Sequence, residues 1–131
     1  MNPMHFGEHL MVDGYGGDEN LLNKKSVVLG VLKELPKILK MKTLSKPQVF
    51  FAPDNHKKDP GGWSGFVVIA ESHISIHTFP ARGFFSADVY TCQNGLNTKK
   101  IVQYFQKLFE TKDVETNFVK RGTRYPKANI Y

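Results

Sequence analysis

Strict alternation of apolar and polar side chains runs from His73 to Phe79, in the middle of the chain. This two-residue period is typical of a β-strand with two different faces. One face takes Ile74, Ile76 and Thr78; the other takes His73, Ser75, His77 and Phe79. A nearly continuous apolar run from Ser64 to Ala70 precedes it, and a turn at 80–83 leads into a strand pattern from Phe85 to Thr91. Strands this close together predict antiparallel hairpins.

Two helical patterns and three further strand patterns flank these hairpins. The additional strands are predicted over 5–14, 48–52 and 114–119. The first helix is predicted from Glu19 to about Leu35, after a cap at Asp18, and Pro36 should kink or end it. The second is predicted over 99–109. Residues 1–131 therefore predict one α/β (α+β) domain, a two-layer sandwich with a mostly antiparallel sheet and two main helices on one face.

Composition fits one soluble domain, because 40% of the 131 residues are hydrophobic and 23% are charged. No apolar run approaches the roughly 20 residues that span a bilayer, and the N-terminus lacks an export signal. The single cysteine, Cys92, suits a reducing compartment, so a cytoplasmic protein without a membrane partner is expected. The net charge of +6 is spread along the chain, which favours a solvated surface over nucleic-acid binding.

The polar side of the 73–79 strand has two interpretations when it is considered alone. His73, Ser75 and His77 beside Cys92 are compatible with a nucleophilic Cys–His pair. A solvent-facing polar strand explains the same residues, and spacing alone favours this second interpretation. No HxxH, CxxC or HExxH spacing is present, so no metal site is expected.

The segment from Ala70 to Cys92 resembles the prokaryotic class of S-adenosylmethionine decarboxylases. The resemblance rests on Glu71-Ser72-His73, His77-Thr78, Pro80, Asp88-Val89 and Thr91-Cys92, with the cysteine 20 residues after the serine. It extends over the whole domain, through Gly7-Glu8-His9-Leu10, Val12-Asp13, Tyr15-Gly16, His56, Pro60, Gly62, Ser64 and Arg121-Gly122.

The resemblance implies that the chain is a proenzyme that cuts itself between Glu71 and Ser72. The Ser72 hydroxyl attacks the Glu71 carbonyl, and β-elimination then separates residues 1–71 from 72–131 and leaves a pyruvoyl group at position 72. Ser64 and His77 match the family's processing residues, with His77 as the base. His77 lies an odd number of residues from Ser72, so an ideal strand would point them to opposite faces, and we expect a bend or bulge near the cut.

For the processed enzyme, the resemblance implies decarboxylation of a small-molecule substrate in polyamine synthesis. The pyruvoyl group forms a Schiff base with the substrate amine and serves as the electron sink. Cys92 matches the family's proton donor to the α-carbon. No metal is implied. Family members assemble and often build the site from two subunits, so a homo-oligomer, a dimer of processed units, is expected.

Two positions depart from the family where it holds the nucleoside. The glutamate that grips the ribose is Ala81 here, and the aromatic residue that stacks on adenine is Lys58. Stacking on a base is worth roughly 1–3 kcal/mol, so the two changes together weaken a nucleoside ligand considerably. Phe79, Phe84, Phe85 and Trp63 are the candidates to replace the missing ring.

This pattern favours a relative that decarboxylates L-arginine or L-ornithine, as some family members do. A basic side chain then needs an acidic contact, for which Asp13, Glu8 and Asp59 are the candidates. The alternative is an S-adenosylmethionine decarboxylase with rearranged contacts. A third possibility is a non-catalytic regulatory homologue, which the intact Ser72, His77 and Cys92 argue against.

Overall fold

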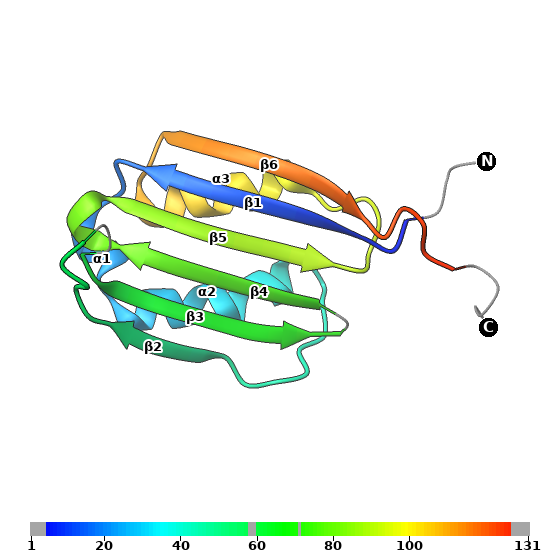
Figure 1. The fold of residues 1–131 in the computed structure, drawn as a ribbon, viewed down its shortest axis with the longest axis horizontal. Coiled ribbons are helices and arrows are strands. Elements are labelled where there is room, and N and C mark those ends of the chain that lie inside the picture. The colour runs from blue at the N-terminus through cyan, green and yellow to red at the C-terminus, as the bar shows by residue number, and fades with distance from the viewer. Residues whose placement is uncertain (1–4, 58–59, 71, 127–131) are drawn as a thin grey trace.

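The computed structural model describes residues 5–57, 60–70 and 72–126 (Figure 1). The chain order is β1 (Gly7–Tyr15), α1 (Glu19–Leu22), α2 (Lys25–Ile38), β2 (Gln48–Ala52), β3 (Gly62–Ile69), β4 (Ser72–Phe79), the 3-10 turn η1 (Pro80–Arg82), β5 (Phe84–Thr91), α3 (Thr98–Phe109) and β6 (Asp113–Arg121). The strands form one sheet in the order β2-β3-β4-β5-β1-β6, and every neighbouring pair is antiparallel.

The helices cover one face of this sheet. α2 lies behind β3 and β4, and α3 lies behind β1 and β6 (Figure 1). Alternate strand residues point into the layer between, where Phe85 packs against Phe105 and Phe109 with ring centroids 5.3 and 4.9 Å apart. The two-layer α+β sandwich predicted from the sequence is confirmed.

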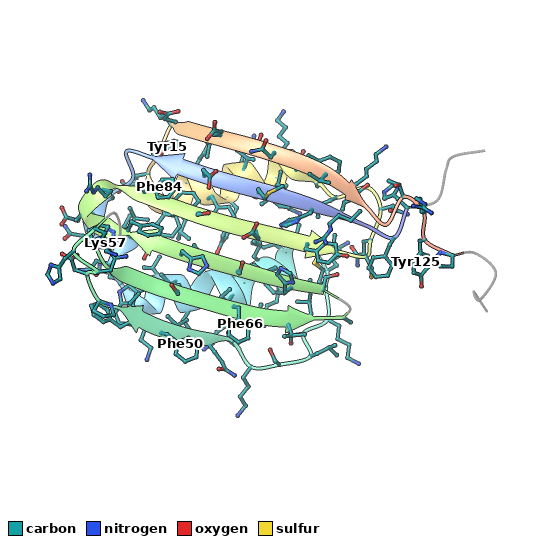
Figure 2. The ribbon with its side chains drawn as sticks, in the orientation of Figure 1. Tyr15, Phe50, Lys57, Phe66, Phe84 and Tyr125 are labelled. Atoms are coloured by element: carbon teal, nitrogen blue, oxygen red, sulfur yellow. The ribbon has the colours of Figure 1, made fainter. Side chains whose placement is uncertain are left out.

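The opposite face of the sheet is not covered by any of the described residues, and we call it the open face. It carries polar side chains in the middle and exposed apolar ones toward the edges. The exposed apolar members are Tyr15, Phe50, Phe66, Val68 and Val119. Figure 2 shows Tyr15, Phe50, Phe66 and Phe84 on the side of the sheet turned to the viewer, with the helices behind.

The first predicted helix differs from the structure at two points. It is interrupted, because Lys24 has an extended backbone and separates α1 from α2. The indole of Trp63 donates a hydrogen bond of 3.1 Å to the carbonyl of Asn23 at this interruption. Of the two effects predicted for Pro36, a kink or an end, the end is wrong, because α2 continues to Ile38. Pro36 is buried with the apolar side of the helix, so packing favours the last turn despite the missing N–H.

The two ends of the sheet carry different groups of candidate residues. The Cys92 end, on the right of Figure 1, holds the start of β4 and the end of β5. The His77 end, on the left, holds the start of β3, the end of β4 and η1. Gly62 closes this second end: its φ is +156°, and an added Cβ would lie 1.9 Å from the carbonyl oxygen of Thr78. Only glycine allows β3 to approach β4 so closely there.

Candidate functional site

Ser72 lies at the Cys92 end of the sheet. It is the first residue of β4 and pairs with Ile69 across the β3–β4 hairpin. Its side chain belongs to the row that faces the helices, and the residue is only 9% exposed. The residues before it contact the segment that follows α2. The Ala70 amide donates a hydrogen bond of 2.8 Å to the Lys42 carbonyl, and Thr43 forms a β-bridge with Ile69. Glu71, the predicted partner in the cleaved bond, lies outside the described residues.

Cys92 directly follows β5 and lies beside the same hairpin. Its Sγ approaches the carbonyl oxygen of Ala70 at 4.0 Å, and the residue is half-buried. The neighbouring β1 residue is Gly7, where an added Cβ would lie 3.2 Å from the Cys92 Cα and 2.3 Å from the Thr91 carbonyl oxygen. The absence of a side chain at Gly7 therefore lets β1 approach β5 next to the thiol. The structure thus brings Cys92, the predicted proton donor, to Ala70, two residues before Ser72.

Ser64 and His77 meet at the other end. They are Cα partners on β3 and β4, and His77 Nδ1 lies 2.8 Å from Ser64 Oγ. Both point to the open face, where His77 is exposed. Since a strand rises about 3.3 Å per residue, five residues separate His77 from Ser72 by roughly 16 Å along β4. The structure brings the two residues predicted to act in processing together but keeps them away from Ser72 of the same chain.

The bend or bulge expected near the cut is absent from the span between Ser72 and His77, so the two side chains point to opposite faces; Glu71 itself lies outside the described residues. β4 pairs regularly with β3 over the whole span from Ser72 to His77. The alternation of buried and less buried residues also continues without interruption along the strand. A regular strand satisfies all of its ladder hydrogen bonds here, so the two side chains stay on different faces.

An acidic residue and an aromatic row lie beside the Ser64–His77 pair on the open face. The strand register puts Asp13, Ser86, His77 and Ser64 side by side on β1, β5, β4 and β3. The next row holds three rings, with Phe84 5.3 Å from both Tyr15 and Phe79 between centroids. Among the described residues none forms a hydrogen bond or ion pair with the Asp13 carboxylate. Two of the predicted substrate contacts, Asp13 and Phe79, therefore lie near the Ser64–His77 pair.

Tyr15 is held in this row from the edge of the sheet. Its hydroxyl donates a hydrogen bond of 2.9 Å to Glu115 on β6. This bond and the neighbouring negative charge raise the pKa of Tyr15, so the phenol stays protonated.

Ala81 is exposed in η1, at the same end of the sheet. It lines a hollow of about 240 Å³ together with Glu19, Asn23, Phe51, Pro60, Gly61, Gly62 and Pro80. Its methyl group can accept no hydrogen bond, so a ribose diol finds no partner at this position. Lys58, the other departure from the family, lies outside the described residues.

Glu8, another candidate substrate contact, already has hydrogen-bond partners within the protein. It is buried on the helix side of β1, where Oε1 accepts a hydrogen bond of 2.8 Å from the Leu96 amide and Oε2 lies 3.1 Å from His5 Nε2. Burial alone would raise its pKa, but the hydrogen bonds from Leu96, His5 and Gly95 outweigh burial and lower it. The carboxylate therefore holds the loop before α3 and is not available to a substrate.

Sequence reasoning missed a polar cluster in the middle of the open face. His9 Nε2 lies 2.9 Å from Asp88 Oδ1, and Ser75 Oγ donates to Asp88 Oδ2 at 3.3 Å. The rings of His73 and Tyr90 adjoin His9. The contact between His9 and Asp88 depends on the pairing of β1 with β5, which no local sequence pattern gives. Among the described residues, no group of three or more His, Cys, Asp or Glu side chains is arranged to hold a metal ion.

Comparisons with known proteins agree on one family. The family model described as S-adenosylmethionine decarboxylase matches residues 8–122. The S-adenosylmethionine decarboxylase proenzymes of Thermococcus kodakarensis and Clostridium botulinum are 36% and 34% identical over 116 residues, which is 88% of this chain and 76% and 94% of theirs. The crystal structure of the adenosylmethionine decarboxylase from Aquifex aeolicus matches with a TM-score of 0.76 and 27% identity, over 90% of this chain and 92% of that one. None of the helices in the described parts of the chain is both long and apolar enough to cross a membrane.

Proposed function

The chain belongs to the S-adenosylmethionine decarboxylase family, and we propose that it is a proenzyme that cuts itself between Glu71 and Ser72 and then acts as a pyruvoyl-dependent decarboxylase. The observation that carries the proposal is the position of Ser72 at the start of β4, paired with Ile69, with the Cys92 thiol 4.0 Å from the nearby Ala70 carbonyl oxygen. A pyruvoyl group at position 72 would condense with the substrate's α-amine and withdraw the electrons released with CO₂. Cys92 then donates its proton to the α-carbon.

Processing requires a base that removes the Ser72 α-proton, and His77 is the base that the family pattern assigns. The Ser64 hydroxyl beside Nδ1 orients the imidazole. Because His77 lies roughly 16 Å along β4 from Ser72 of its own chain, it cannot act there directly. We therefore place His77 and Ser64 in the site of a second copy.

The open face is the surface on which the second copy would lie. It exposes Phe50, Phe66 and Val68 on one side and Val119 on the other, which is unusual for a surface that stays in water. Two copies stacked through their open faces about a two-fold axis, with strands running in opposite directions, would place the Cys92 end of each over the His77 end of the other. Two-fold symmetry then makes two equivalent sites. The assembly is a dimer of processed units.

For the substrate, we propose a free basic amino acid, L-arginine or L-ornithine. Ala81 removes the hydrogen-bond acceptor that a ribose needs, and Lys58 removes the ring for adenine. Asp13 lies in the row of Ser64 and His77 and keeps a carboxylate for a cationic side chain. The aromatic row of Tyr15, Phe84 and Phe79 beside it offers ring faces that attract cations. Product amines of this kind belong to polyamine synthesis.

S-adenosylmethionine is the second candidate, because the relatives of 34–36% identity carry its name. Its sulfonium is also a cation, so Asp13 and the aromatic row do not exclude it. Ala81 and Lys58 are the residues that separate the two candidates.

One protein preparation tests both parts of the proposal, which are self-cleavage and decarboxylation. Denaturing gels with mass spectrometry should show residues 1–71 and 72–131, the second blocked at its N-terminus by pyruvoyl, and Ser72→Ala should stay intact. The kcat/KM for CO₂ release is then compared among L-arginine, L-ornithine and S-adenosylmethionine. An intact parent chain that releases no CO₂ from any of them contradicts the proposal and favours a regulatory homologue.

The same comparison of kcat/KM values decides which substrate is correct. If S-adenosylmethionine gives the highest kcat/KM, the second candidate is correct. If arginine or ornithine does, Ala81→Glu with Lys58→Phe should shift the preference back toward the nucleoside. These two positions can share one pocket, so the double variant need not equal the sum of the single ones.

A further inference from the structure

The His9–Asp88 pair has no role in the processing and decarboxylation steps described above. It lies in the middle of the open face, with the His9 side chain 17% and the Asp88 side chain 32% exposed. Asp88 receives a second hydrogen bond from Ser75, which fixes the direction of its carboxylate. A histidine oriented by a fixed carboxylate is the arrangement in which proteins hold a proton acceptor.

The hydrogen bond fixes the tautomer of His9. An ionised carboxylate can only accept, so the proton of the neutral imidazole must be on Nε2, which faces Asp88 Oδ1 at 2.9 Å. Nδ1 is then the unprotonated nitrogen. Asp88 also stabilises the imidazolium that forms when Nδ1 takes up a proton.

The pair is close to the Cys92 end. His9 is the Cα partner of Tyr90, which is in turn the partner of His73, the residue next to Ser72. Cys92 directly follows β5, two residues after Tyr90, and its neighbour on β1 is Gly7, two residues before His9. The titratable and charged groups around His9 are Asp88 and Tyr90 from β5 and His73 from β4, with Arg121 from β6 4.5 Å above the Tyr90 ring.

The reaction needs a proton acceptor at this end of the sheet. The α-amine of a free amino acid is largely protonated at neutral pH and has no lone pair for attack until it loses a proton. Cys92 is assigned as a proton donor, and Ser64 with His77 is assigned to processing. Glu8 points to the helix side and is held by the Leu96 amide and His5.

We propose that His9, oriented by Asp88, is the base that removes the proton from the substrate's α-ammonium group. The ammonium N–H bond breaks, its electron pair stays on the substrate nitrogen, and the proton goes to His9 Nδ1. Asp88 holds the resulting imidazolium charge through Nε2–H. In the condensation the C–N bond replaces the ketone C=O bond, and the oxygen leaves as water with two protons. One is the proton that His9 returns, and the other is a second N–H proton that the substrate nitrogen loses as the protonated imine forms. His9 therefore ends the step neutral. This inference rests on the function proposed above.

The tautomer can be tested without a processed enzyme. In ¹⁵N-histidine-labelled Ser72→Ala protein, which does not cleave, His9 should carry its proton on Nε2 in the neutral form. Asp88→Asn in this background should change the Nε2 signal, whereas the control His5→Gln should leave it unchanged. A neutral His9 with its proton on Nδ1 would overturn the proposal.

Kinetics test the base itself, with self-cleavage as the check on folding. Gln at position 9 can donate to Asp88 but cannot take up a proton, so His9→Gln should cleave normally and lose about 10²–10⁴-fold in kcat/KM at neutral pH. The loss should shrink as the pH rises toward the pKa of the substrate amine, because the free amine then arrives already deprotonated. Asp88→Asn should lose less kcat/KM than His9→Gln, and its loss should vary with pH in the same way. His5→Gln should have the kcat/KM of the parent.

The outcomes separate this inference from the proposed function. A parent that neither cleaves nor releases CO₂ removes the function itself. A parent that does both, with a His9→Gln variant of equal kcat/KM or with a loss that does not vary with pH, overturns only the role of His9. If His9→Gln fails to cleave, the tautomer measurement on the Ser72→Ala background still decides the point.

Discussion

At the scale of single residues, Cys92 separates the two reactions assigned to this chain. It lies beside Ala70, two residues before Ser72, but no processing step uses its thiol. Cys92→Ala should therefore cleave at the parent rate and release CO₂ about 10²–10⁴-fold more slowly, the usual contribution of a positioned proton donor. Gels and CO₂ release on the same sample measure both effects. Decarboxylation at the parent rate would reduce the thiol to a packing role.

Glu8 gives a second residue-scale prediction, this time for stability. Its pKa is lowered in the fold, so its contribution to stability is complete above the pKa of the unfolded chain and is lost as the pH falls through the folded value. Glu8→Gln should lower the free energy of unfolding by about 1–3 kcal/mol at pH 7, because the charged hydrogen bonds to Leu96 and His5 are weakened. Urea titrations on the Ser72→Ala background, at pH 7 and below pH 4, measure the difference. A penalty that is equal at both pH values would contradict the charged role.

The sequence predicted candidate residues better than it predicted their arrangement. The alternation along 73–79 is regular in the structure, so the bend or bulge that was expected to bring Ser72 and His77 to one face is not found between them. Partnership across strands depends on strand order and register, which no local pattern encodes. The Ser64–His77 contact therefore emerged only from the pairing of β3 with β4, and the His9–Asp88 contact only from the pairing of β1 with β5.

At the scale of elements, the N-terminus of α3 links the sheet to the helix layer. Asn97 caps α3, and its side-chain oxygen accepts a hydrogen bond of 3.0 Å from the Lys100 amide. Asn97→Ala should lower the free energy of unfolding by about 0.5–2 kcal/mol. Self-cleavage should be unaffected, because the cap lies on the helix side. Asn97→Asp, which can still cap, is the matched control in the urea titration, and an equal loss in both variants would argue against capping.

Helix boundaries were the elements least predictable from sequence. Periodicity gave the apolar side of α2 through Val28, Leu32 and Leu35 but not the interruption at Lys24. That interruption coincides with the hydrogen bond from Trp63, 40 residues away along the chain. A local rule predicted a kink or an end at Pro36, but Pro36 is buried and α2 continues past it to Ile38.

At the scale of the whole molecule, a two-layer sandwich leaves one sheet face without a partner layer. Ser64 and His77, the proposed processing residues, lie at one end of this sheet and Ser72 lies at the other, so no side-chain rotation joins them. The proposed second copy would cover the apolar edges of the open face and would supply the missing half of each site.

Complementation between two inactive variants tests this assembly. Ser72→Ala has no serine to cleave and His77→Ala has no base, so each should stay intact alone. In a mixed dimer, the His77→Ala chain brings an intact Ser72 to the intact His77 of the Ser72→Ala chain. Random pairing makes half of the dimers mixed with one working site of two, so about one quarter of the parent activity should return. The cut should appear only in the His77→Ala chain, at a native mass twice the 14.9 kDa of one chain.

Ser72→Ala mixed with the Ser72→Ala/His77→Ala double variant should stay uncut. If His77→Ala cleaves alone, or if the mixture stays intact while the parent is a processed monomer, the two-copy site is wrong.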